Sequence, residues 1–246
     1  MLILAEADFN LAQLVVELSQ GGQDFFHSPI SQCEKIKILT RFQDSFLQPI
    51  SGSRRYSIDI LKIPLIEDIL LASIHVPDKS HNTPDDQAEF CRNFIEEVKR
   101  VEENIKITKT VIVGDSNMNP FEPTMVKSTG FHAISSANVV EKLSRTIQER
   151  ECKFLYNPMW GWLGDLKNDI IGSYHYNTGN HINYFWNTFD QVLIRPELIP
   201  NLDKESLQIL SSDEKKSLLT RHGLPDKKAF SDHLPLLFTL KMNIMI

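Results

Sequence analysis

Residues 111–117, which read VIVGDSN, are the stretch on which the interpretation of the chain depends. A run of branched apolar residues that ends in a glycine and an aspartate is typical of a buried strand with polar chemistry at its end. Residues 231–238, SDHLPLLF, carry the same elements in the opposite order. Carboxylate oxygens are preferred ligands of Mg²⁺, and histidine and asparagine side chains can contact a phosphate. Two such strand ends that converge would form a metal-assisted phosphoester site.

The composition limits the class of protein. A chain of 246 residues can build one large domain with a substantial core, so a single domain over residues 1–246 is expected. The net charge of −6 argues against a broad basic face for nucleic acid, although a cleft with its own cations can accept phosphates. Three widely spaced cysteines predict free thiols in a reducing compartment. With no signal sequence and no apolar stretch of membrane-span length, a cytoplasmic protein is expected.

Apolar runs of strand length recur between polar segments. They lie at residues 2–5, 36–42, 56–63, 69–75, 110–113, 189–194 and 235–240. Helices are predicted for residues 8–19, 83–104, 136–146 and 203–219, and the second of these begins with a Thr-Pro-Asp-Asp sequence typical of a helix start. Residues 152–186 are rich in aromatic side chains without a clear period, which predicts a loop-rich, ordered insertion.

Five of these features occur in the order typical of the endonuclease/exonuclease/phosphatase superfamily, which the chain resembles over essentially its whole length. They are Glu6 after an apolar run, His75 in ASIHVP, the GDSN of residues 114–117, the FDQVLI of residues 189–194 and the SDH of residues 231–233. This family includes deoxyribonuclease I, exonuclease III and the apurinic endonucleases. The resemblance implies an α/β fold, a two-layer β-sandwich of mixed sheets flanked by helices.

The sequence departs from the family pattern in two places. The family normally begins with another strand, whose Asn helps to bind metal or phosphate, and no residue before Met1 supplies it. An upstream segment, a partner chain or a rearranged start is expected to take that place, because a sheet with an open edge is prone to aggregation. The second departure is Ser116, where the family has phenylalanine in Gly-Asp-Phe-Asn; its side chain need not touch substrate.

The resemblance implies a metal ligand set and a site for the attacking water. Glu6 is the principal ligand of Mg²⁺, for which Mn²⁺ can substitute, and Asp232 is a second carboxylate near the metal. Asp115 orients or deprotonates the attacking water, and Asn117 donates a hydrogen bond to a phosphate oxygen.

Histidines complete the implied site. His233 contacts the phosphate and is oriented by a hydrogen bond to Asp190, while His75 faces the leaving group, with Glu34 as a weaker candidate for its orienting carboxylate. Further substrate contacts are assigned to Glu34, Arg41, Asn157, Tyr184 and Trp186.

The function expected from this set is a Mg²⁺-dependent phosphoester hydrolase, and specifically a nuclease that cleaves phosphodiester bonds by attack of water. A phosphatase or phosphodiesterase acting on a lipid headgroup or small metabolite is an alternative, although WNTFDQ at residues 186–191 does not match the motif of inositol-polyphosphate 5-phosphatases. A non-catalytic binding module on the same fold is another. Taken singly, Glu6 could be a solvated strand end, His75 a core histidine and the aromatic residues a satellite core.

Overall fold

The computed structural model describes residues 1–7, 10–28, 33–166, 168–213 and 215–242. These residues form two compact units, which are treated separately below: residues 1–115 with residue 242, and residues 116–241. Among the described residues, no helix is long and apolar enough to cross a membrane.

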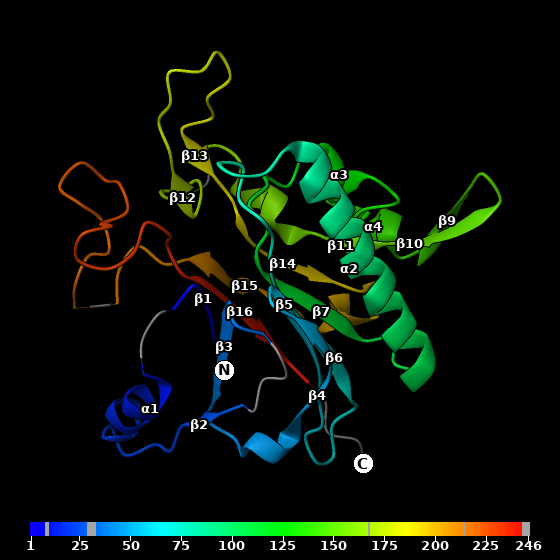
Figure 1. Ribbon diagram of the computed structural model, residues 1–246, viewed down its shortest axis with the longest axis horizontal. Coiled ribbons are helices and arrows are strands. Elements are labelled where there is room, and N and C mark those ends of the chain that lie inside the picture. Colours follow the sequence, from blue (N-terminus) through cyan, green and yellow to red (C-terminus); the bar gives the residue numbers. More distant parts are fainter. Residues whose placement is uncertain (8–9, 29–32, 167, 214, 243–246) are drawn as a thin grey trace. The chain divides into compact units, whose positions relative to one another are not determined.

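The first unit contains two groups of strands (Figure 1). In the first, β1 (Leu2–Ala5), β3 (Ile36–Thr40) and β2 (Phe26–His27) form an antiparallel sheet in that order. In the second, β4 (Leu47–Ser53), β5 (Tyr56–Leu61), β6 (Ile69–His75) and β7 (Thr110–Asp115) follow one another, with the β6–β7 pair parallel and the others antiparallel. Every residue of β6 is buried, as expected for a strand covered on both faces.

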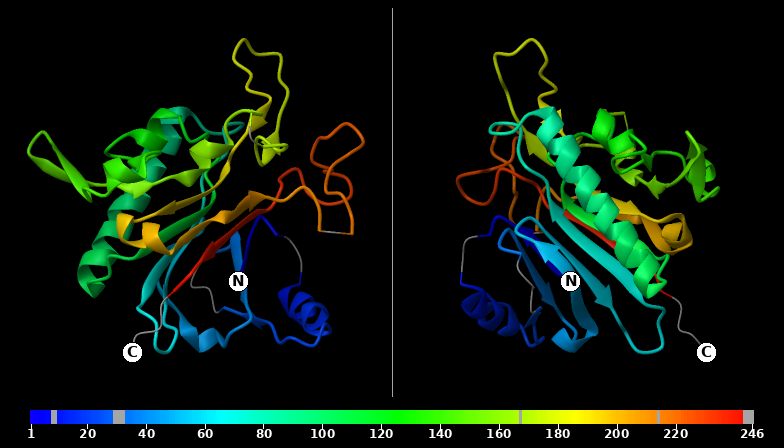
Figure 2. Two further views of the ribbon diagram at one scale, coloured as in Figure 1. Left: turned by 180° about the vertical axis from the view of Figure 1, so that it is seen from behind. Right: turned by 45° about the vertical axis from the view of Figure 1, so that its right-hand side comes forward.

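Helix α2 (Pro84–Ile105) connects β6 to β7 and confirms the helix predicted there. Its first turn is closed by a capping box, in which Thr83 Oγ1 accepts from the Asp86 backbone N–H and the Asp86 carboxylate accepts from the Thr83 N–H. The helix lies along the strands β5 and β6 (Figures 1 and 2). The Phe94 ring lies 5.1 Å from that of Tyr56 in β5. The unit also contains α1 (Leu11–Ser19) and a 3₁₀ turn, η1 (Asp44–Phe46).

Gly114 allows β6 and β7 to approach closely. Its φ is +144°, and a Cβ atom added to it would lie 1.9 Å from the carbonyl oxygen of Ile74, its register partner in β6. A residue without a side chain is therefore required here. The next pair in the register is His75 and Asp115, so this close approach brings two of the predicted site residues together.

The second unit is built from short pieces. Strand β14 (Asp190–Ile194) pairs antiparallel with β11 (Leu155–Tyr156), which runs parallel to β8 (Ala133–Ile134). Three separate antiparallel pairs accompany them: β9 (Ser144–Ile147) with β10 (Arg150–Lys153), β12 (Tyr174–His175) with β13 (Trp186–Asn187), and β15 (Leu202–Ile209) with β16 (Leu236–Leu240). Short helical turns are α3 (Pro123–Val126), α4 (Ala137–Val140), η2 (Pro158–Trp162) and η3 (Pro196–Asn201).

The strands follow the predicted runs, but the helix predictions hold only in part. The helix predicted for residues 203–219 is wrong: residues 202–209 form strand β15, in which buried Leu207 and Ile209 alternate with exposed Gln208. In residues 136–146 the helix ends at Val140 and β9 begins at Ser144. The helix predicted from Asp8 begins at Leu11, and Asp8 itself lies outside the described residues. The 152–186 segment includes β11, η2 and β12 between its loops.

Candidate active site

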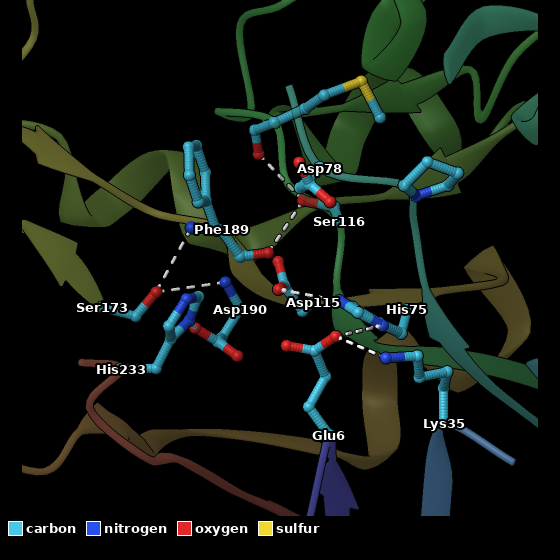
Figure 3. Close-up of polar contacts among 12 residues, drawn as sticks. Glu6, Lys35, His75, Asp78, Asp115, Ser116, Ser173, Phe189, Asp190 and His233 are labelled. Atoms are coloured by element: carbon cyan, nitrogen blue, oxygen red, sulfur yellow. Dashed lines mark hydrogen bonds and ion pairs between the residues drawn. The ribbon is translucent and has the colours of Figure 1, made fainter. Parts of the chain in front are cut away.

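In the first unit, Glu6 and Lys35 face each other where β1 and β3 meet. The strand pairing continues one residue beyond β1, because the Glu6 N–H donates to the Lys35 carbonyl oxygen at 2.9 Å. The Lys35 Nζ in turn donates to Glu6 Oε1 at 2.9 Å (Figure 3). Glu6 adopts a left-handed conformation, with φ at +53°. Backbone and side chain therefore both hold this carboxylate beside an ammonium group.

His75 lies between two carboxylates of the same unit (Figure 3). Its Nε2 is 3.6 Å from Asp115 Oδ2, and its Nδ1 is 3.9 Å from Glu6 Oε1. His75 and Asp115 are buried, whereas the Glu6 side chain is 58% exposed. The residue predicted to orient His75, Glu34, accepts instead from Arg54 Nε at 2.9 Å. His75 thus lies between the buried carboxylate of Asp115 and the exposed carboxylate of Glu6.

Glu6 has the properties of a ligand for a hard divalent cation. The hydrogen bond from Lys35 lowers its pKa, burial opposes this, and the charges of His75 and Arg55 lower it further, so the carboxylate is ionised at neutral pH. Within the described residues, the side-chain contacts of Glu6 with Lys35 and His75 are both made by Oε1. Among those residues no group of three or more His, Cys, Asp or Glu side chains is arranged around one metal position. Mg²⁺ does not require such a group, since it commonly takes one or two carboxylates and keeps several waters.

In the second unit, the predicted bond between Asp190 and His233 is present. Asp190 begins β14, His233 precedes β16, and Asp190 Oδ2 lies 2.7 Å from His233 Nδ1 (Figure 3). Both side chains are about one quarter exposed, at 23% and 26%. A carboxylate on Nδ1 fixes the ring's orientation and favours the proton on that nitrogen. His233 is therefore both held in one orientation by Asp190 and partly accessible to solvent.

Ser173 and Tyr174 hold this pair in place. Ser173 Oγ accepts from the backbone N–H groups of Phe189 and Asp190, at 3.2 and 3.1 Å. The Tyr174 ring lies 4.6 Å from the His233 ring and 5.4 Å from that of Phe189. The sequence pointed to this aromatic segment but gave no means of choosing these two residues from it.

A buried amide supports the turn that carries Asn117. Gln191 Nε2 donates to Ser116 Oγ at 2.8 Å and to the Met118 carbonyl oxygen at 2.6 Å. Ser116 Oγ also lies 2.8 Å from the carbonyl oxygens of Met118 and Phe189. Asn117, between these anchors, has φ at +48°. The small hydroxyl at position 116 therefore has a structural role, which the sequence alone did not reveal.

The second carboxylate predicted to bind metal, Asp232, is also paired with a lysine. Its Oδ2 accepts from Lys227 Nζ at 3.2 Å, and both side chains are exposed. Each of the two predicted metal ligands therefore carries its own ammonium partner.

The remaining predicted contacts are dispersed. Asn157 is fully buried; its amide nitrogen donates to Gln191 Oε1 at 2.8 Å and its oxygen caps η2, which places it in the framework of the second unit. Arg41 is exposed and stacks over the Phe25 ring at 5.3 Å. Tyr184 is 55% exposed, and Trp186 is half-buried with its ring 5.3 Å from that of His175.

No family model and no curated protein matches the sequence. The fold does match solved structures. The catalytic domain of human nocturnin aligns at 12% identity over 98% of this chain and 80% of that one, with a TM-score of 0.51. The 3′-phosphatase NExo from Neisseria, solved with a product DNA hairpin, aligns at 11% identity over 97% and 88%, with a TM-score of 0.52. An AP endonuclease from Archaeoglobus fulgidus aligns at 12% identity over 97% and 87%, with a TM-score of 0.50.

These alignments cover nearly the whole chain, and the similar structures are a catalytic domain, a 3′-phosphatase and an AP endonuclease. The expected fold class, the deoxyribonuclease I-like α/β fold with mixed sheets, is therefore confirmed. At these identities the likeness concerns the fold, and the chemistry has to be argued from the side chains.

Proposed function

We propose that this protein is a divalent-metal-dependent phosphoester hydrolase, and that its substrate is a nucleic acid cleaved at a phosphodiester bond. The observation that carries the proposal is the Asp190–His233 pair, in which a histidine that is one quarter exposed is held by a 2.7 Å bond to a carboxylate. A histidine held in this way can stabilise negative charge that develops on a phosphate. This chain has its fold in common with a 3′-phosphatase and an AP endonuclease, and that likeness supports the proposed chemistry by analogy.

Other predicted site residues supply the remaining requirements of the reaction. Glu6 would hold the cation, Mg²⁺ or Mn²⁺, and Asp232 is proposed as a further carboxylate ligand. When bound, the cation supplies positive charge to the phosphate oxygens. Asp115, buried beside His75, is the group that orients the attacking water and receives its proton. His75 donates a proton towards the leaving oxygen, and Asn117 donates a hydrogen bond to the phosphate.

A nucleic acid is favoured over a lipid headgroup or a small metabolite by the aromatic surface next to His233. The Tyr174 ring lies against His233, and Tyr176 stacks on Tyr174 with its ring 6.3 Å away and its side chain 53% exposed. Flat exposed rings of this kind stack on bases without regard to sequence. In the 3′-phosphatase from Neisseria, the bound product is a DNA hairpin.

The test is hydrolysis of a substrate panel by wild type and His233→Ala in Mg²⁺ and in Mn²⁺. The panel holds plasmid DNA, single-stranded DNA, RNA, an abasic duplex, a 3′-phosphorylated oligonucleotide and bis-nitrophenyl phosphate. We expect cleavage of at least one nucleic acid, and a loss of roughly 10²–10⁴-fold in the variant, because a positioned acid–base or charge-stabilising group contributes that much. His222→Ala is the matched control, since His222 is an exposed histidine of the same unit that bonds to Arg221.

Equal inactivity of wild type and His233→Ala in both metals on every substrate would contradict the enzyme proposal. Hydrolysis of the terminal phosphate alone would keep the chemistry and replace the nuclease by a phosphatase.

A further inference from the structure

A lysine ammonium is already bound at the carboxylate to which the proposed function assigns the metal. Lys35 Nζ lies 2.9 Å from Glu6 Oε1, with side chains 30% and 58% exposed. The contact is supported by the backbone bond between the same two residues and by the left-handed conformation of Glu6. Because the two residues are cross-strand neighbours, their side chains start from adjacent positions on the same face. The local backbone structure at the end of β1 therefore places the two charged groups side by side.

We propose that Lys35 is a resident cation that restrains metal binding at Glu6 until an anionic phosphate reaches the site. The inference rests on the proposed function, because it takes Glu6 as the metal ligand. A Mg²⁺ or Mn²⁺ ion coordinates a carboxylate oxygen at about 2.0–2.2 Å, which places it within roughly 5 Å of an ammonium bonded to the same carboxylate. Like charges at that distance repel, so the metal binds weakly while Lys35 remains in place.

The groups around Glu6 strengthen this argument. His75 Nδ1 lies 3.9 Å from the same oxygen, and the positive charges of Lys35 and Arg55 both act on Glu6. A further cation is therefore added to an environment that is already rich in positive charge. A phosphate anion reverses the balance, because it gives the ammonium a second partner and gives the metal additional oxygen ligands. Metal and substrate are expected to bind with positive coupling.

The test is titration calorimetry of the full chain with Mn²⁺ alone, which does not require activity. We expect Lys35→Gln to bind Mn²⁺ roughly tenfold more tightly than wild type, because the repelling charge is gone. Lys35→Arg, which keeps the charge, should stay close to wild type. Lys37→Gln is the matched control: Lys37 is half-buried inside β3, two residues beyond Lys35, so the variant removes the same charge from a neighbouring position and should change the affinity less than about twofold.

A second titration in the presence of dimethyl phosphate tests the coupling. The diester should strengthen Mn²⁺ binding in wild type more than in Lys35→Gln. Unchanged or weaker Mn²⁺ binding by folded Lys35→Gln, as judged by its circular dichroism, would overturn the inference, and so would equal strengthening in both proteins. Glu6→Gln distinguishes failure of the metal site at Glu6 from failure of the role assigned to Lys35. If it loses Mn²⁺ binding, Glu6 is the ligand and only the role of Lys35 is at stake; if it binds as wild type does, the proposed metal site fails as well.

Discussion

Asp59 is a carboxyl group at the centre of the first unit that takes no part in the proposed chemistry. It has no exposed surface, its Oδ2 accepts from Ser57 Oγ at 2.8 Å, and its Oδ1 has no hydrogen-bond partner among the described residues. Burial raises the pKa of Asp59 to about 6, an effect that the Ser57 hydrogen bond partly opposes. At a pH between the ordinary pKa and this raised value, Asp59 is therefore protonated in the folded protein and ionised in the unfolded chain.

This gives a pH dependence with a definite sign. Between the ordinary pKa of 3.8 and the raised value of about 6, the folded state binds more protons than the unfolded state, so the free energy of unfolding falls as pH rises through that window. We expect Asp59→Asn to remove this slope and to gain roughly 3 kcal/mol over wild type above pH 7. Urea unfolding at pH 5 and pH 8 measures it. Asp24→Asn, at an exposed position of the same unit, should leave the slope unchanged; a wild-type stability that does not fall between these pH values would contradict the account.

At the residue scale, sequence patterns identified side chains better than they identified their partners. Asp190 and His233 were paired correctly, because the family pattern that carries them includes the bond. Lys35 and Gln191 were missed, since a lysine before a strand and a glutamine inside one are common. Their importance comes from strand register and burial, which the sequence does not display. Glu34 was the weaker candidate for the carboxylate that orients His75, and it bonds to Arg54 instead.

At the scale of elements, the capping box of α2 makes a measurable contribution. Thr83→Ala removes the hydroxyl that accepts from the Asp86 N–H, so a helix donor loses its partner. We expect a loss of about 1 kcal/mol in the free energy of unfolding by urea. Thr83→Ser retains the hydroxyl and should lie close to wild type. If the serine variant loses as much as the alanine variant, the methyl group rather than the cap is responsible.

Elements with a strong period were predictable, and those whose state depends on pairing were not. Helix α2 has both an apolar stripe and start signals, and β6 is a continuous apolar run. Residues 203–219 are charged, and local preference favours a helix there. Strand β15 forms instead because it pairs with β16, which is distant in sequence, from Leu202 with Leu240 to Ile209 with Leu236. Tertiary context commonly overrides propensity in strands of this kind.

For the chain as a whole, the proposed reaction uses both Asp115 and His233 in one transition state. A double-mutant cycle with Asp115→Asn and His233→Ala tests this on the substrate that wild type cleaves. Residues that act as a set in one transition state are strongly non-additive, so the double variant should lose little more kcat/KM than the more damaging single variant. If the fold-loss in kcat/KM of the double variant equals the product of the two single losses, Asp115 and His233 act independently and the proposal is contradicted.

The close approach at Gly114 has a consequence for the evolution of the chain. Every amino acid other than glycine carries a Cβ atom. At position 114 that atom would lie 1.9 Å from the carbonyl oxygen of Ile74. No conservative exchange exists, and no side-chain repacking can relieve a clash with a carbonyl oxygen. Position 114 is therefore closed to gradual change. Lineages that retain His75 beside Asp115 are expected to reach new substrates through the loops, leaving this strand crossing as it is.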